Sequence, residues 1–198
     1  MGRTATVARE TTETKIALAV DIDGTGQATV HTGIGFFDHM LTLLAGHSLF
    51  DLSIQCEGDV HVDGHHTVED VGRALGVAVK DCLGDRCGIR RFGHSILPMD
   101  ESLVTAAVDL GGRAATVLAV EYPVPAIGAF DVQLVEVFWE SFAATAGANV
   151  HAVLHHGSNA HHIAEAVFKA TARSLRMAVE QDSRQPGVPS TKGVLTDE

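Results

Sequence analysis

Hydrophobic and polar positions along the chain follow two different periods, which separate the expected strands from the expected helices. Alternating or short continuous apolar runs predict strands, whereas apolar residues three and four positions apart predict helices. The expected strands are residues 14–23, 27–32, 50–60, 102–110, 114–122 and 148–156. The expected helices are residues 36–47, 67–83, 130–147 and 159–180. The turn signal "DGTG" after the first strand predicts a hairpin between residues 14–23 and 27–32.

The sequence carries an internal duplication. A shift of 96 residues lays the helix start "HHTVE" at 65–69 on "HHIAE" at 161–165, and apolar positions further along the two helices also coincide. Together with the repeated order of strands and helices, this indicates two similar fused half-repeats. The expected fold is therefore α+β: each half-repeat is a mainly antiparallel four-stranded sheet with helices on one face, and its other face is free to pack on a neighbour.

The half-repeats are expected to form one compact domain, with the first at residues 1–92 and the second at 93–182. Residues 183–198 contain two prolines, two glycines and few large apolar side chains, which predicts a loop or a C-terminal arm.

Charge and composition narrow the class of partner. The net charge of −11 argues against a nucleic acid or an anionic membrane, because both require a positive protein surface. The sequence has no apolar run long enough to span a bilayer. Cys56, Cys82 and Cys87 show no CxxC spacing, and the N-terminus lacks an apolar signal core, so a reducing, cytoplasmic location is expected. We expect a soluble protein whose partner is a small molecule.

The duplicated HHxxE motif predicts metal binding. Successive helical residues turn by about 100°, so His65 and Glu69 point to the same side, while His65 and His66 diverge. We therefore expect two metal sites, each taking one histidine and one glutamate from a helix and a histidine from elsewhere. Imidazole and carboxylate ligands without a thiolate suit Mn, Fe, Co, Ni or Zn. The alternative, a capped and solvated helix start, is weakened by the second copy in register. The spacing also differs from the HExxH motif of metalloproteases.

Further candidates depend on weaker signals. His39, His47 and His151 could join a site, although a lone histidine is more often a packed or surface residue. Basic residues are scarce, and several of them lie beside glycines, where backbone can approach an anion. The candidates for holding phosphate are Arg90, Arg91, Arg113, Lys169 and Lys192, of which Arg91 and Arg113 are the strongest. A solvated surface is the alternative for each.

Six segments together resemble the imidazoleglycerol-phosphate dehydratase family. They are "TGIGFFDHML", "DGHHTVEDVG", "RFGHSILPMDESL", "DLGGR", "AHHIAEAVFKATARSLRMA" and "PSTKGVL", and the resemblance runs from about Thr11 to Leu195. The doubled HHxxE motif with the PMDE and PSTKG segments is its most specific part.

The resemblance implies an α+β fold of the ribosomal protein S5 domain 2-like type, made of two fused half-repeats. It also implies twenty-four subunits, with active sites at subunit interfaces and two Mn2+ in each. The implied reaction is a lyase step of histidine biosynthesis, in which D-erythro-imidazoleglycerol phosphate loses water to give imidazole-acetol phosphate. Metals on both sides of the substrate ring would stabilise an imidazolate, whose electrons expel hydroxide and leave a diazafulvene-like intermediate.

The resemblance also assigns roles to individual residues. The implied metal ligands are His39, His65, His66, Glu69, His161, His162 and Glu165. The implied catalytic residues are Glu13, an acid/base carboxylate, together with His65, Glu69, Asp100, His162 and Glu165, and Glu101 lines the same site. The implied substrate-binding residues are Glu13, His39, His47, His65 and Glu69, with Arg91, Arg113, Ser190 and Lys192 holding the phosphate.

Two positions depart from the family pattern. Gly111 stands where many members have serine, which removes one phosphate donor. Val137 stands where many members have histidine or glutamate, and His151 is the candidate replacement as a metal ligand.

Two other functions use similar residues. A dinuclear metal hydrolase would also need histidine and carboxylate ligands, and only substrate turnover separates it from a dehydratase. A non-enzymatic metal-binding shell or storage protein would take up metal without removing water. The sequence lacks the Glu and Glu-x-x-His pattern of di-iron bundles, which weighs against that last function.

Overall fold

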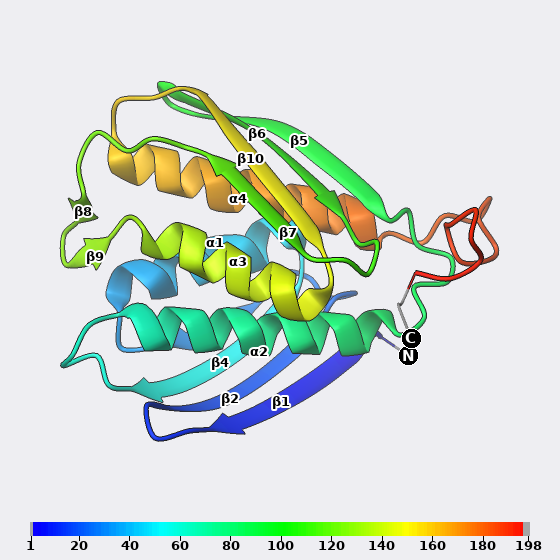
Figure 1. Cartoon of the computed structure of the whole chain (residues 1–198), viewed down its shortest axis with the longest axis horizontal. Helices are drawn as coiled ribbons and strands as arrows, with labels where there is room; N and C mark the ends of the chain where they lie inside the picture. Colours follow the sequence, from blue (N-terminus) through cyan, green and yellow to red (C-terminus); the bar gives the residue numbers. More distant parts are fainter. Residues whose placement is uncertain (1, 196–198) are drawn as a thin grey trace.

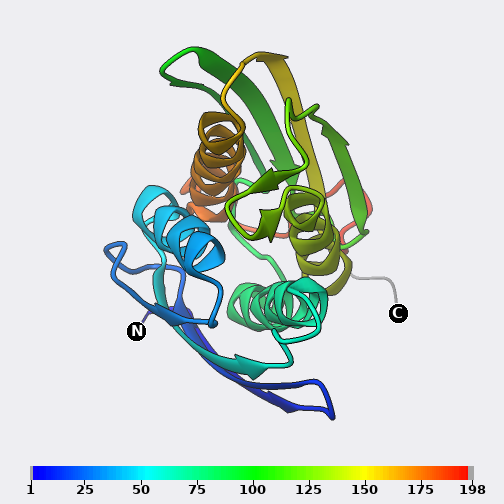
Figure 2. The same ribbon diagram turned by 90° about the vertical axis from the view of Figure 1, so that its left-hand side faces the viewer.

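Two four-stranded sheets enclose four helices in the computed structural model, which describes residues 2–195 (Figures 1 and 2). The first half contains β1 (Thr4–Glu10), β2 (Thr14–Asp21), β3 (Ala28–His31), α1 (Gly35–Ser48), β4 (Asp51–Gly58) and α2 (His65–Leu83). The second half contains β5 (Phe92–Met99), β6 (Ser102–Asp109), β7 (Ala115–Ala119), β8 (Ala126–Ile127), β9 (Phe130–Asp131), α3 (Leu134–Ala146), β10 (Asn149–His156) and α4 (Ala160–Val179).

The two sheets have the same topology. Their strand orders are β1-β2-β4-β3 and β5-β6-β10-β7. In each sheet the first two pairs of neighbours are antiparallel and the last pair is parallel. This confirms the predicted α+β class and the duplication, and it makes α1 the counterpart of α3 and α2 the counterpart of α4.

The predicted hairpin between residues 14–23 and 27–32 is wrong. β3 pairs in parallel with β4, whereas β2 lies between β1 and β4. The reason is that α1 connects β3 to β4, and a strand–helix–strand unit places its two strands in parallel. The connection before β3 is held by the Asp51 carboxylate, which accepts hydrogen bonds from the backbone N–H groups of Thr25 and Gln27, both at 2.8 Å.

Two edge strands, β1 and β5, were not predicted from the sequence. In β1 small apolar residues alternate with polar ones, and the side chains range from half-buried to exposed. β5 contains a proline, Pro98, which sequence patterns place outside a central strand but which an edge strand tolerates. Each strand is set by its neighbour, since β1 pairs along its whole length with β2, and β5 with β6.

The core lies between the sheets. α2 packs on β1 and β2, and α4 packs on β5 and β6, so the inner face of each sheet is covered and the outer face is exposed (Figure 2). Trp139 is fully buried, with its ring centroid 4.9 Å from that of Phe138 and 5.2 Å from that of Phe168. Phe37 of α1 lies against the same cluster, with its ring centroid 5.5 Å from that of Phe138, and this contact joins the two halves. Within residues 2–195 no helix combines the length and the apolar character that crossing a bilayer requires.

Candidate metal centre and basic pocket

Two side chains of the second HHxxE motif, His161 and Glu165, converge with His39 of α1 at one end of α4. Glu165 Oε1 lies 2.7 Å from His39 Nε2 and 3.1 Å from His161 Nε2, and the three ligand atoms lie within 4.8 Å of one another. Asn159 starts α4 by accepting a hydrogen bond from the backbone N–H of His161, which fixes the first turn. One helix thus supplies a histidine and a glutamate, and the neighbouring α1 supplies the second histidine, as the sequence predicts.

Glu165 is held ionised. Burial raises the pKa of its carboxyl, but hydrogen bonds from Lys169, His39 and His161 outweigh burial and lower the pKa to about 2. Lys169 Nζ lies 2.5 Å from the second carboxylate oxygen, so the cluster contains its own balancing cation. The ring of Phe36 lies edge-on to both histidines and restricts their motion. The result is a compact set of three potential metal ligands, two imidazoles and one carboxylate.

The second histidine of each motif is oriented by a carboxylate. His162 Nδ1 lies 2.7 Å from Glu101 Oε2, and His66 Nδ1 lies 2.9 Å from Asp59 Oδ2. In each case this hydrogen bond raises the histidine pKa. It also fixes the ring, so that Nε2 points away from the orienting carboxylate, an arrangement typical of metal-binding histidines.

The candidate acid/base carboxylates lie close to these oriented rings. Glu13 Oε1 is 3.7 Å from His66 Nε2, and Asp100 Oδ2 is 3.7 Å from His162 Nε2. Glu101 was predicted from the sequence to line the site, but its pairing with His162 was not, and Asp59 was not predicted at all. A sequence signal for these partners does exist. Asp59 follows the end of β4, seven residues before His66, and Glu101 lies in the turn between β5 and β6.

The first motif forms no comparable cluster within one chain. His65 is exposed, and the Glu69 carboxylate has Arg73 Nη1 at 3.9 Å. Across residues 2–195 the group His39, His161 and Glu165 is the only set of three potential ligands that converges.

His47 and His151 occupy different environments. His47 lies half-buried on α1, and its pKa is lowered first by burial and then by Lys169 and Arg173. Like His39, it lies on α1, which packs against α4. His151 alternates with buried Val150 and Ala152 along β10, so it is exposed on the outer face of its sheet. The structure does not bring His151 together with the other candidate ligands of its own chain.

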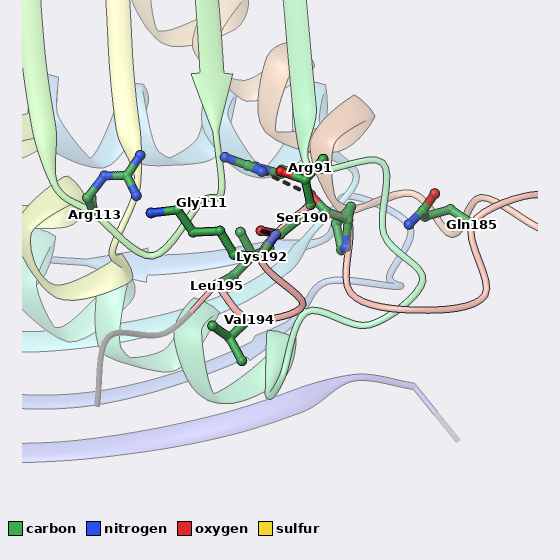
Figure 3. A pocket seen from close by; sticks show the side chains of 10 residues that line it. Arg91, Gly111, Arg113, Gln185, Ser190, Lys192, Val194 and Leu195 are labelled. Carbon is green, nitrogen blue, oxygen red and sulfur yellow. Dashed lines mark hydrogen bonds between the residues drawn. The ribbon is translucent and has the colours of Figure 1, made fainter.

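A basic pocket lies at the other end of the molecule. It is a cavity of about 590 Å³, and residues from the loop before β5, the β6–β7 turn and the C-terminal segment surround it (Figure 3). Of the predicted phosphate-binding residues, Arg91, Arg113, Ser190 and Lys192 line it. The other two candidates do not, since Arg90 pairs with Glu180 and Lys169 pairs with Glu165. In Figure 3 the Lys192 side chain extends toward Arg113. The structure thus brings together four residues that lie up to about a hundred positions apart in the sequence.

Arg91 is fixed inside this pocket. Its guanidinium donates hydrogen bonds to both carboxylate oxygens of Asp109, at 2.7 and 3.1 Å, and to the Pro189 carbonyl oxygen at 2.9 Å. A Cβ at Gly111 would come within 2.8 Å of Arg91 Nη2 and Asp109 Oδ2. The glycine therefore leaves room for this ion pair, which gives the departure from serine a physical role.

The cluster and the pocket are far apart within one chain. The cluster lies at the start of α4, whereas Arg91 N–H donates a hydrogen bond to the carbonyl oxygen of Ala178 near its end. At 1.5 Å per helical residue, His161 and Ala178 are separated by roughly 25 Å. Figure 1 shows the two ends of α4 at opposite sides of the molecule, with the C-terminal segment beside the later end.

Comparison with known proteins gives a consistent result. A sequence model of the imidazoleglycerol-phosphate dehydratase family matches residues 32–175. Relatives of that name from Rhodopirellula baltica and Acidiphilium cryptum are 58% and 54% identical, each over 98% of this chain and over 96% and 100% of their own lengths. The crystal structure of the dehydratase from Staphylococcus aureus matches with a TM-score of 0.82 at 32% identity, covering 90% of this chain and 99% of its own. That from Pyrococcus furiosus matches with a TM-score of 0.83 at 34% identity, covering 96% of this chain and 100% of its own. The chain therefore belongs to the imidazoleglycerol-phosphate dehydratase family.

Proposed function

We propose that this protein removes water from D-erythro-imidazoleglycerol phosphate to give imidazole-acetol phosphate, a step of histidine biosynthesis. Family membership supports the reaction. The observation that carries the proposal is the cluster of His39, His161 and Glu165, whose potential ligand atoms lie within 4.8 Å of one another at one end of α4. The basic pocket supports the proposal, because Arg113 and Lys192 bring to it the positive charge that recognition of a phosphate requires.

The ligand atoms fit a divalent transition metal. Two imidazole nitrogens and a carboxylate oxygen, without a thiolate, suit Mn2+, and we propose two Mn2+ in each active site. The residues proposed to hold them are His39, His65, His66, Glu69, His161, His162 and Glu165. When bound, the metal acts as a Lewis acid that stabilises the negative charge developing on the substrate ring.

The protein's own residues handle protons and orientation. Loss of water breaks one C–H and one C–O bond, so the reaction needs a base and an acid. We assign this work to the exposed carboxylate of Glu13, with Asp100 in the corresponding place beside His162. Asp59 and Glu101 hold the rings of His66 and His162, and Lys169 keeps Glu165 anionic.

Phosphate recognition falls to the basic pocket. Arg113 and Lys192 supply charge, Ser190 supplies a hydroxyl, and Arg91 holds the C-terminal segment through the Pro189 carbonyl oxygen. Within residues 2–195 the Arg113 guanidinium has neither an ion pair nor a side-chain hydrogen bond, so it is available to a ligand.

The active site is proposed to be shared between chains. The substrate's three-carbon chain is far shorter than the roughly 25 Å between the cluster and the pocket, measured along α4. One substrate molecule therefore cannot reach both regions of a single chain. We propose a homo-oligomer with active sites at subunit interfaces, and we propose the twenty-four subunits implied by the family resemblance.

The cellular compartment is proposed to be the cytoplasm. Cys56, Cys82 and Cys87 are all free thiols, and Cys87 is exposed. Free thiols of this kind persist in a reducing environment.

Removal of metal is expected to abolish dehydration. Purified protein would be stripped with a chelator and assayed for imidazole-acetol phosphate, then assayed again after addition of Mn2+. We expect activity to disappear with the metal and to return with Mn2+, accompanied by loss and recovery of assembly in light scattering. Release of inorganic phosphate would identify a hydrolase, and metal uptake without turnover would identify a storage protein. Unchanged turnover after complete chelation would refute the metal mechanism.

A further inference from the structure

The internal duplication can be aligned residue by residue from the structure. A shift of 98 residues lays Leu49 on Gly147, which end α1 and α3 with the same φ of 61°. The same shift lays Asp51 on Asn149, the first residues of β4 and β10. Each buried residue of α1 has a buried counterpart 98 positions later in α3. These α1 residues are Phe37, Met40, Leu41, Leu44, Ala45 and Ser48.

This alignment pairs a ligand with an apolar residue. His39 of α1 falls on Val137 of α3. In the other helix pair, His161 and Glu165 of α4 correspond to His65 and Glu69 of α2. The site built on α4 therefore has a third ligand from its neighbouring helix, whereas the equivalent position beside α2 carries a valine.

Contacts between α2 and α3 place Val137 beside the His65 and Glu69 motif of α2. A Cβ at Gly64, the residue before α2, would lie 3.1 Å from Leu134 Cδ1. A Cβ at Gly72 would lie 2.7 Å from the carbonyl oxygen of Phe138. Val137 lies between Leu134 and Phe138 in sequence, and the turn carrying Glu69 lies between Gly64 and Gly72. The valine therefore neighbours the Glu69 turn, where it packs half-buried against the core.

Glu165 and Glu69 differ in their surroundings, as expected if only one of the two motifs has a histidine from the neighbouring helix. The Glu165 side chain is 8% exposed and contacts two histidines and a lysine, whereas the Glu69 side chain is 39% exposed, with Arg73 at 3.9 Å. One carboxylate is preorganised among ligands before any ion binds. The other gains no such organisation from α3.

We propose that the two metal positions are unequal. The His161 and Glu165 motif, completed by His39, binds the tighter ion. The His65 and Glu69 motif, with Val137 in place of a ligand, binds a weaker and readily exchanged divalent cation. This inference rests on the proposed metal-dependent function. Loss of one oriented ligand lowers metal affinity by at least about tenfold, because even partners outside the coordination shell contribute about 10- to 100-fold.

Titration of the metal-free protein with Mn2+ tests this inequality. Free Mn2+ would be followed by electron paramagnetic resonance, with binding heats from calorimetry as a second readout. We expect two classes of site of equal number, whose dissociation constants differ by at least about tenfold. Val137→His should tighten the weaker class by about tenfold or more and leave the tighter class unchanged, whereas the matched control Val137→Leu should tighten neither.

Two further variants keep the test decisive. Val137→Glu supplies a ligand of different size in case histidine disturbs packing at this position. His39→Val copies the α3 arrangement into α1, so it should turn the tighter class into a second weak class. A single class of sites in the wild type, or a titration unaffected by His39→Val, would overturn the inference while leaving the proposed function intact. Absence of any Mn2+ binding would overturn the proposed function as well.

Discussion

Replacing Glu165 by glutamine is expected to lower kcat/KM for dehydration by at least about a thousandfold. A bound metal contributes several kcal/mol to transition-state stabilisation, and each 1.4 kcal/mol corresponds to a factor of ten. Glutamine keeps the shape of the side chain but removes the charge that two histidines and Lys169 surround. The variant should also lose the tighter Mn2+ class in a binding titration.

The matched control for this variant is Glu180→Gln. Glu180 follows α4 and forms an exposed ion pair with Arg90, so its replacement removes the same charge away from the cluster. We expect wild-type activity and metal content for the control. A Glu165→Gln variant with more than a tenth of wild-type activity would show that this carboxylate does not hold a catalytic ion.

Replacing Arg113 by alanine is expected to lower kcat/KM by about a hundredfold, mainly through a higher KM. A charged hydrogen-bonded contact contributes about 1.5–3 kcal/mol, and the guanidinium has no competing partner within the described chain. The phosphate group does not take part in the reaction. Loss of its contact with Arg113 should therefore weaken substrate binding more than it lowers kcat. Steady-state kinetics over a wide range of substrate concentration separates the two effects.

Arg184→Ala is the control for the loss of a basic residue. Arg184 is exposed on the same C-terminal segment but does not line the pocket. Its replacement should leave KM within about twofold, since exposed charges contribute little. If Arg113→Ala and Arg184→Ala behaved alike, the pocket would not be the phosphate site.

The helices and the duplication could be predicted because their signals are local. Apolar spacing located all four long helices, and the repeated HHxxE motif pointed to a second half with the same plan. The pairing of the strands was harder to predict from the sequence. The pairing of β3 with β4 is imposed by α1, and the edge strands β1 and β5 are stabilised by neighbours rather than by their own apolar content. These are tertiary effects that a local pattern does not contain.

In the candidate site, too, the features set by local sequence were predictable, and those set by contacts between separate elements were not. The motif residues were predictable from spacing, and His39 was a candidate from the sequence. The ring-orienting role of Asp59 and the depth of Glu165 were not predictable, because both depend on contacts between separate elements. The separation of the cluster from the basic pocket likewise follows from the direction of α4, which brings its two ends to opposite sides of the molecule.

Each active site is proposed to combine the metal cluster of one chain with the basic pocket of another. Mixing Glu165→Gln and Arg113→Ala subunits tests this directly when the subunits are dissociated together, reassembled with Mn2+ and assayed at substrate concentrations well below KM. Under these conditions each variant alone is expected to retain at most about a hundredth of the wild-type activity. If each site draws the two residues from different chains, about a quarter of the sites regain both, and activity should recover to about that fraction of the wild type. Activity that stays at the level of the separate variants, in mixed assemblies verified by mass spectrometry, would contradict a shared site.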